Sequence, residues 1–184
     1  MTYYGSKEIA ASFRTVRNNT IAIAEDIPEE HYGFRASPES RSVAQTLVHI
    51  AVMPRLTEQI HFVERRTTFD GFDFFGVMGA LMAEEKVARS KADIILMLRE
   101  GGDKFAQLLE GCQEEFLGET VTYPQGMVPP GKSRFEMLIS AKEHEMHHRG
   151  QLMVMERMIG VVPHLTRQMQ ERIAAMQAAR KAGA

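Results

Sequence analysis

The chain has 184 residues, of which 44% are hydrophobic, and a net charge of −2 at neutral pH. We expect a single domain over residues 1–184 with a buried core, and the balanced charge gives no reason to expect a nucleic acid or an anionic membrane as partner. One cysteine excludes a disulfide within the chain, and the sequence has neither a signal-peptide core nor an apolar run of membrane-spanning length, so we expect a cytoplasmic protein.

The first two predicted helices are amphipathic. Residues 6–27 carry apolar side chains at alternating spacings of three and four residues, and Pro28 ends this pattern. The second helix covers residues 42–65 and begins with Ser42, which has Gln45 three residues after it in the arrangement of a capping box. Pro54 lies inside this helix, so we expect a kink or a lost backbone hydrogen bond there.

Two less regular segments flank a third long helix. In residues 67–89, phenylalanines alternate with aspartates and glycines, and we expect a long crossover that covers one end of the fold and has a short helix in 77–89. Residues 90–112 form the third long helix, which Ser90 and Asp93 can cap. The Gly- and Pro-rich residues 114–132 form a loop, with a short extended piece at 119–123.

The fourth helix is the longest and is predicted for residues 133–160, because Ser133 and Glu136 can form a capping box and Gly160 is placed to end it. A last amphipathic helix follows Pro163. Four long helices with one apolar stripe each must bury those stripes against one another, which predicts an all-α four-helix bundle with an extra C-terminal helix. The long crossover allows the second and third helices to run parallel.

Ionisable residues interrupt the apolar stripe of the fourth helix at Glu145 and His148. His144 lies one turn before His148, so both imidazoles face the same side of the helix and can bind one metal ion. His49, in the apolar stripe of the second helix, is a candidate third ligand, although a lone histidine in such a stripe is more often a hydrogen-bonded core residue. Three imidazoles suit zinc, nickel or iron and leave a coordination position open for water or substrate.

A peptidase site is one alternative. The residues from His144 to His148 match the H-E-x-x-H pattern of zinc peptidases, in which Glu145 would be the general base. The extended form of that pattern fails because Val154 stands where it has another histidine. Glu156 is then the candidate third ligand.

A ferritin-like di-iron site is another alternative, because the Glu-x-x-His motif of such bundles occurs twice in the sequence. The site would also need an inward-facing carboxylate from each of the other two helices, and the nearest candidates lie outside the apolar stripes. The motifs are Glu58–His61 and Glu145–His148, and the candidate carboxylates are Glu25 and Glu100.

Two segments resemble one known family. The stretch S-V-A-Q-T-L-V-H-I at residues 42–50 and the stretch H-E-M-H-H-R-G-Q-L at residues 144–152 are similar to the DinB/YfiT-like family of metal-binding four-helix bundles. The resemblance implies a long crossover between the second and third helices, metal ligands at His49, His144 and His148, and frequent homodimers. It also implies that the metal activates the sulfur of a low-molecular-weight thiol, as in the members with known activity, for transfer or isomerisation.

Two classes of function follow from these patterns. In the first, the protein is a transferase-like or hydrolase-like enzyme, in which a divalent ion lowers the pKa of a thiol or a water that attacks a small electrophilic substrate. Glu145 is the candidate for moving a proton, and Gln151 could orient a ligand. In the second, the metal is structural in a non-catalytic, dimeric binding or stress-response module. A fourth protein ligand would favour the second class, and an accessible open position would favour the first.

The remaining notable side chains have simpler predicted roles. We expect His61 and His164 to be surface or loop residues. Cys112 has no second cysteine with which to form a metal or redox motif, so we expect a buried, small apolar residue there.

Overall fold

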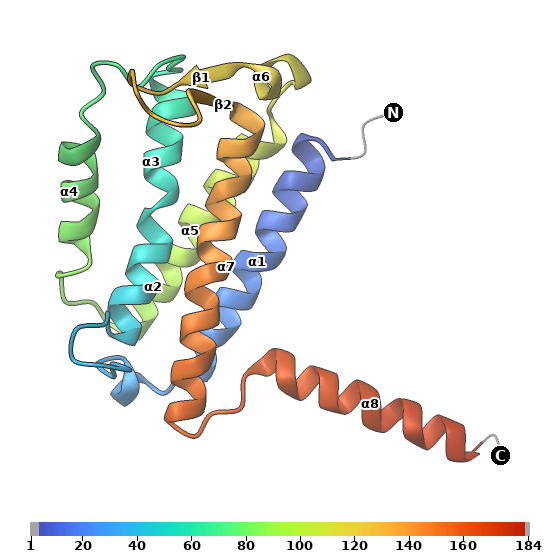
Figure 1. Ribbon diagram of the computed structural model, residues 1–184. Coiled ribbons are helices and arrows are strands. Elements are labelled where there is room, and N and C mark those ends of the chain that lie inside the picture. Colours follow the sequence, from blue (N-terminus) through green and yellow to red (C-terminus); the bar gives the residue numbers. More distant parts are fainter. Residues whose placement is uncertain (1–3, 183–184) are drawn as a thin grey trace.

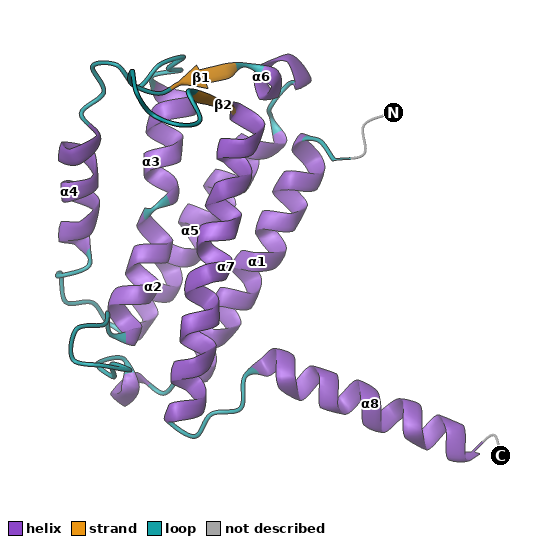
Figure 2. Ribbon diagram, viewed as in Figure 1, coloured by secondary structure: helices purple, strands orange, loops and turns teal. Residues whose placement is uncertain are grey.

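The computed structural model describes residues 4–182, which are mostly helical (Figures 1 and 2). The helices are α1 (Ser6–Asp26), α2 (Val43–Val52), α3 (Pro54–Glu58), α4 (Phe74–Glu84), α5 (Lys91–Glu110), α6 (Glu114–Gly118), α7 (Arg134–Met158) and α8 (His164–Ala182). A 3-10 turn covers Glu29–His31 and a π-helical turn covers Gln59–Val63. Strands β1 (Thr120–Thr122) and β2 (Gly131–Ser133) pair antiparallel.

Four helical segments form the bundle, which confirms the predicted fold class. Helix α1 packs against α5 and α7, and α2 packs against the same two helices, so that α1 and α2 lie diagonally opposite each other. Helix α4 returns the chain to the end at which α2 began, and α2 and α5 therefore run in the same direction (Figure 1). Inward-facing side chains such as Phe13, Leu47, Leu98 and Leu138 are buried between the four segments.

The predicted capping boxes are present at the starts of three helices. In α7, the Ser133 backbone N–H donates to Glu136 Oε2 (2.9 Å), and the Glu136 N–H donates to Ser133 Oγ (3.2 Å). Ser42 with Gln45 and Ser90 with Asp93 form the same reciprocal pair before α2 and α5. Since these contacts satisfy backbone N–H groups that have no partner within the helix, they fix where each helix begins.

The second predicted helix is divided at Pro54. Helix α2 ends at Val52, and Pro54 is the first residue of α3, where its missing N–H has no helical partner to lose. Met53, between them, keeps helical angles (φ −58°, ψ −35°), so the chain continues in the same general direction. The proline thus produces the predicted interruption without breaking up the bundle.

The crossover has two parts, and the second part lies along the side of the bundle. Helix α4 lies along the side of α2 (Figure 1), where Val77 and Leu81 pack against the hydrophobic cluster of α2 and α5. The first residues of the crossover lie beside β1 at one end of the bundle, as predicted: Thr68 forms a parallel bridge with Thr122, and the Phe69 N–H donates to the Thr122 carbonyl oxygen (2.9 Å). The expectation was wrong for α4, because an apolar pair one turn apart attaches this helix to the side. Helix α6 and the β1–β2 pair also lie at that end. The predicted extended piece in the 114–132 loop is β1.

The surface placement predicted for two histidines was also wrong. His61 is buried, and its Nδ1 accepts a hydrogen bond from Arg134 Nη1 (3.0 Å). His164 is buried where α8 meets α1, and its Nε2 donates to Asn19 Oδ1 (3.1 Å). Cys112 is buried as predicted. None of the helices within residues 4–182 combines the length and apolarity needed to cross a bilayer.

A buried carboxyl lies at the junction of α7 and α8. Glu156 is fully buried, and neither of its carboxylate oxygens has a hydrogen-bond partner among the described residues. Burial, together with the nearby Asp26 carboxylate, raises the pKa of Glu156 from 4.5 to about 7, although Arg167 and Arg157 act in the opposite direction. The folded protein therefore holds a proton that the unfolded chain releases.

We predict that Glu156→Gln stabilises the fold at pH 8 more than at pH 4. Between about pH 4.5 and pH 7 the unfolded chain loses the Glu156 proton and the folded chain keeps it, so the stability of the wild type falls as the pH rises. Glutamine does not titrate in this range. The unfolding free energy of Glu156→Gln therefore rises relative to that of the wild type, and the difference between the two proteins grows to about 2–3 kcal/mol at pH 8. Urea unfolding of both proteins at the two pH values measures it. A difference independent of pH would contradict the assignment.

Candidate metal centre

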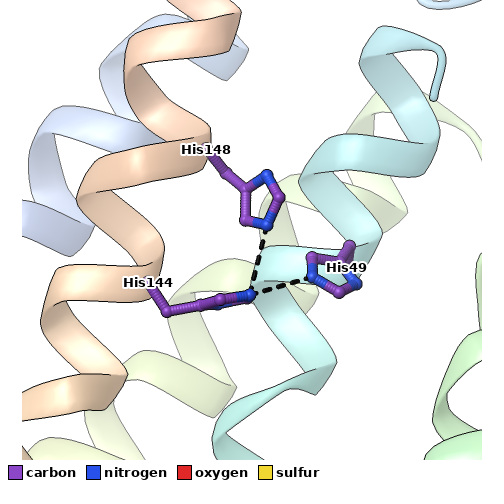
Figure 3. A group of neighbouring side chains, drawn as sticks. All are labelled: His49, His144 and His148. Atoms are coloured by element: carbon purple, nitrogen blue, oxygen red, sulfur yellow. Dashed lines mark hydrogen bonds between the residues drawn. The ribbon is translucent and has the colours of Figure 1, made fainter. Parts of the chain in front are cut away.

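The three predicted ligands come together between α2 and α7 (Figure 3). His144 and His148 lie one turn apart on α7, and their Nε2 atoms are 3.2 Å apart. His49, in the last turn of α2, brings its Nε2 to 3.2 Å from that of His144. One ring nitrogen from each of the three lies within 4.8 Å of the other two, and among the described residues no carboxylate or thiolate joins this group.

Hydrogen bonds to the far side of two rings set which nitrogen carries the proton. His49 Nδ1 donates to Glu85 Oε1 (2.7 Å), and His148 Nδ1 donates to Gln151 Oε1 (2.8 Å). Because carboxylate and carbonyl oxygens accept, the lone pairs of His49 and His148 are on Nε2, which points into the group. Gln151 thus orients His148, in agreement with its predicted role.

Glu85 was missed by the sequence analysis. It follows the C-terminal end of α4, 36 residues after His49, and its second oxygen accepts from Arg41 Nε (2.6 Å). No spacing rule connects these three positions, because the crossover alone brings Glu85 to α2. The crossover therefore contributes to the site by holding one of the candidate ligands.

The surroundings keep the imidazoles neutral. Burial is the largest cause that lowers the pKa of His144, to about 4, and the other two histidines, His147 and Arg41 lower it further. Burial also lowers the pKa of His49 and of His148, although hydrogen bonds to Glu85 and Gln151 oppose this effect. At neutral pH the three rings are therefore unprotonated at the converging nitrogens, as metal ligands must be.

The donor geometry fits a divalent metal ion. In a tetrahedral site with Zn–N distances of 2.0–2.1 Å, neighbouring ligand nitrogens are about 3.3 Å apart, close to the 3.2 Å found here. Hydrogen bonds among the three histidines cannot satisfy all of the converging nitrogens in place of a cation. A neutral His144 has one N–H, so it can donate to only one of the two lone pairs that face it. A cation satisfies all three nitrogens at once.

Glu145 lies next to the ligands in sequence but is committed to other partners. It is buried, and its carboxylate accepts from Arg17 Nε (3.0 Å), Arg17 Nη2 (2.9 Å) and Thr20 Oγ1 (2.7 Å). These contacts occupy both carboxylate oxygens of Glu145. This geometry gives Glu145 a structural role and does not support the predicted catalytic one.

The alternative metal sites are not assembled among the described residues. In the di-iron motif, Glu58 pairs with Lys104 and His61 with Arg134, and Glu25 pairs with Arg99 at the surface. In the peptidase alternative, Glu156 would be the third metal ligand after His144 and His148. The residue that joins these two histidines is His49, whereas Glu156 is buried beside α8.

A wide cavity of about 1030 Å³ reaches the site from the side of His148. Its wall combines three cationic side chains, several amides and hydroxyls, and an apolar strip. These residues include Arg35, Arg41, Lys86, Gln45, Gln151, Met82 and Val154. A small molecule with both polar and apolar parts could therefore approach the histidines directly.

Comparison with known proteins agrees with the fold. The DinB family model matches residues 1–179. This chain belongs to the DinB family. The family predicted from the segments around His49 and His148 is thereby confirmed.

Individual DinB-family relatives share the architecture over most of the chain. YjoA of Bacillus subtilis (strain 168) is 25% identical over 157 residues, which cover 84% of this chain and 91% of YjoA. The crystal structure of YjoA, a DinB-like protein, superposes with a TM-score of 0.60 at 24% identity, covering 83% and 92% of the two chains. YfiT from Bacillus subtilis, described as a probable metal-dependent hydrolase with an unusual four-helix bundle topology, has a TM-score of 0.66 at 13% identity, covering 88% and 91%.

We predict that Glu85→Gln lowers the affinity of this DinB-family protein for a divalent metal about 10- to 100-fold, because the carboxylate that orients His49 is lost. Glu84→Gln is the matched control, since Glu84 is the preceding residue and pairs with Arg89 instead. Competition with a chromophoric chelator measures both affinities. Equal affinities in the two variants would show that Glu85 does not support the site.

Proposed function

We propose that this DinB-family protein is a metal-dependent enzyme in which a low-molecular-weight thiol or a water attacks a small electrophilic substrate. The observation that carries the proposal is the convergence of three neutral imidazole nitrogens beside a cavity of about 1030 Å³. A closed structural site would have a fourth protein ligand. Among the described residues the group contains three, which favours chemistry over a purely structural metal.

Zinc or nickel is the proposed ion, with iron as a further candidate, because neutral imidazoles suit these metals. When bound, such an ion supplies a Lewis acid that lowers the pKa of a nucleophile and polarises the substrate. The description of YfiT as a probable metal-dependent hydrolase supports the metal dependence, although the identity to that protein is only 13%. The proposal that a low-molecular-weight thiol is the nucleophile rests on the family resemblance.

Side chains around the cavity orient the ligands and transfer protons in this proposal. Glu85 and Gln151 hold the ligand rings in place. His147 lines the cavity, and its Nε2 is 3.2 Å from Gln151 Nε2, so this amide links it to His148. We assign the transfer of the proton released by the nucleophile to His147, because imidazole is the side chain most often used for that step.

The test compares two histidine variants in the metal-loaded protein. With L-cysteine as thiol and 1-chloro-2,4-dinitrobenzene as electrophile, and separately with p-nitrophenyl acetate and water, we expect metal-dependent turnover in one of the two assays. His49→Ala keeps two of the three ligands, so it should bind the metal more weakly and lose turnover. His147→Ala should keep the metal and lose about 100-fold or more in rate. Equal rates in the loaded wild type and in His49→Ala in both assays would contradict the proposal.

A further inference from the structure

A second cavity, of about 370 Å³, lies where the π-helical turn, the end of α5 and α6 meet. Its wall includes His61 and Arg65 from the first of these segments, and Cys112 and Phe116 from the other two. His61 lies 12 residues after His49 along a nearly continuous helix, which corresponds to about 18 Å at 1.5 Å per residue. This cavity is therefore separate from the candidate metal centre, and the proposed mechanism does not use it.

His61 presents an unused hydrogen-bond donor to this cavity. Its side chain is buried, with 2% of its surface exposed. Because arginine nitrogens only donate, the contact of 3.0 Å with Arg134 Nη1 uses the lone pair on His61 Nδ1 and leaves the proton on Nε2. His61 Nε2 has no hydrogen-bond partner among the described residues, and the ring lines the cavity. Since buried N–H groups are almost always paired, this one indicates an acceptor that the cavity takes up from outside.

A fully buried guanidinium holds this donor in place. Besides its contact with His61, Arg134 donates to Glu119 Oε2 (2.8 Å), which balances its charge, and to the Arg65 carbonyl oxygen (3.4 Å). Burial and the charge of Arg134 lower the pKa of His61 to about 4, so the ring is neutral at pH 7 and keeps its one proton on Nε2. Arg134 thus fixes both the orientation of the imidazole and the position of the Arg65 backbone.

The polar groups of the cavity wall are donors and a cation. Arg65 contributes a guanidinium whose Cζ lies 5.3 Å from the centre of the Phe116 ring, and Gln107 and Gln113 contribute amides. No acidic side chain of the described chain lines the cavity. A guanidinium beside an N–H donor matches the two oxygens of a carboxylate.

The rest of the wall is apolar. Phe62 and Leu108 line the cavity together with Phe116 and Cys112. An inorganic anion would use the polar groups alone and leave these side chains uncovered, whereas an organic anion covers both. The volume of about 370 Å³ lies at the small end of the range of ligand pockets, which suits a body of one or two fused rings.

We propose that this second cavity binds a small organic carboxylate with a flat apolar body. The carboxylate accepts from the His61 Nε2–H and from the Arg65 guanidinium, and the apolar body packs against Phe116 and Leu108. The ligand thereby supplies the acceptor that the buried imidazole lacks, and Arg65 balances its charge. Binding at this site requires no metal ion, because its polar groups are independent of the three histidines between α2 and α7.

The first experiment measures binding of 1-naphthoate to the full-length protein by isothermal titration calorimetry, with 1-naphthamide as the neutral analogue of the same shape. We expect a dissociation constant of about 1 mM or tighter for naphthoate, and binding at least about 10-fold weaker for naphthamide. Zinc-loaded protein and protein treated with EDTA should give the same value. Equal binding of the two compounds, no binding of naphthoate, or binding only in the zinc-loaded protein would overturn the proposal.

Two pairs of variants locate the bound carboxylate. Arg65→Asn removes the cation, and asparagine suits the φ of 47° at this position, so we expect a folded protein with a dissociation constant at least about 10-fold higher. Arg172→Asn removes the same charge from an exposed position in α8 and should leave the affinity unchanged.

The second pair fills the cavity. Gly111 lines it, and a Cβ there would lie 3.5 Å from the Gln107 carbonyl oxygen, an ordinary contact, so Gly111→Leu adds a side chain to the cavity without a clash at Cβ and should abolish binding. Gly118→Leu, at a position whose Cβ would meet nothing within 4 Å among the described residues, is the control and should bind normally. Circular dichroism checks that each variant is folded.

Cys112, the one cysteine of the chain, reports on occupancy of the cavity that it lines. Burial raises the pKa of its thiol to about 11, so its alkylation by N-ethylmaleimide is slow, and we expect saturating naphthoate to slow it at least about 5-fold further. Intact-mass spectrometry measures the labelling. An unchanged labelling rate at saturating naphthoate, or an affinity for naphthoate in Gly111→Leu equal to that of the wild type, would place the ligand elsewhere and overturn the proposal.

Discussion

The structure depends most on one buried side chain, Arg17 of α1. Its guanidinium donates to Glu145 of α7, to the Leu98 carbonyl oxygen of α5 (2.8 Å) and to the Ile50 carbonyl oxygen of α2 (3.3 Å). A buried cation is tolerated only when it is paired and hydrogen-bonded, and removing one partner of such a pair costs about 3–5 kcal/mol. Arg17 thus fixes the relative heights of all four bundle segments. Gly102 of α5 makes room for it, since a Cβ there would lie 2.7 Å from Arg17 Cγ.

This contact acts one residue away from the metal ligands. Ile50 follows His49 on α2, and Glu145 follows His144 on α7, so the interaction that aligns α2 with α7 also aligns the two helices that carry the histidines. The H-E-x-x-H segment therefore divides its functions. Two of its histidines, His144 and His148, face the metal centre, whereas its glutamate is paired with Arg17 in the core of the bundle.

The sequence was most informative where structure is determined locally. Capping boxes at Ser42, Ser90 and Ser133 predicted where helices begin, and the four-residue spacing of His144 and His148 predicted a shared face. It was least informative where a residue's partner is distant in the chain. Glu85 reaches His49, and Arg134 reaches His61, only through the tertiary fold.

Arg17 was not predicted as a buried partner, although the sequence contains a signal for it. Glu145 falls on the apolar stripe of α7, and a carboxylate in that position requires a buried cation on a facing helix. Arg17, four residues after Phe13 on the buried side of α1, is in the position to provide it. His49 could not be assigned in this way, because a buried histidine needs only a hydrogen bond, and the family resemblance was required to include it.

The central claim is that the bundle brings three imidazoles around one divalent ion, and X-ray absorption at the zinc edge of the zinc-loaded, untagged protein tests it most directly. The account predicts three imidazole nitrogens at about 2.0–2.1 Å in the wild type and two in His49→Ala. An unchanged imidazole count in His49→Ala, or a wild-type zinc shell with fewer than three imidazoles, would contradict it.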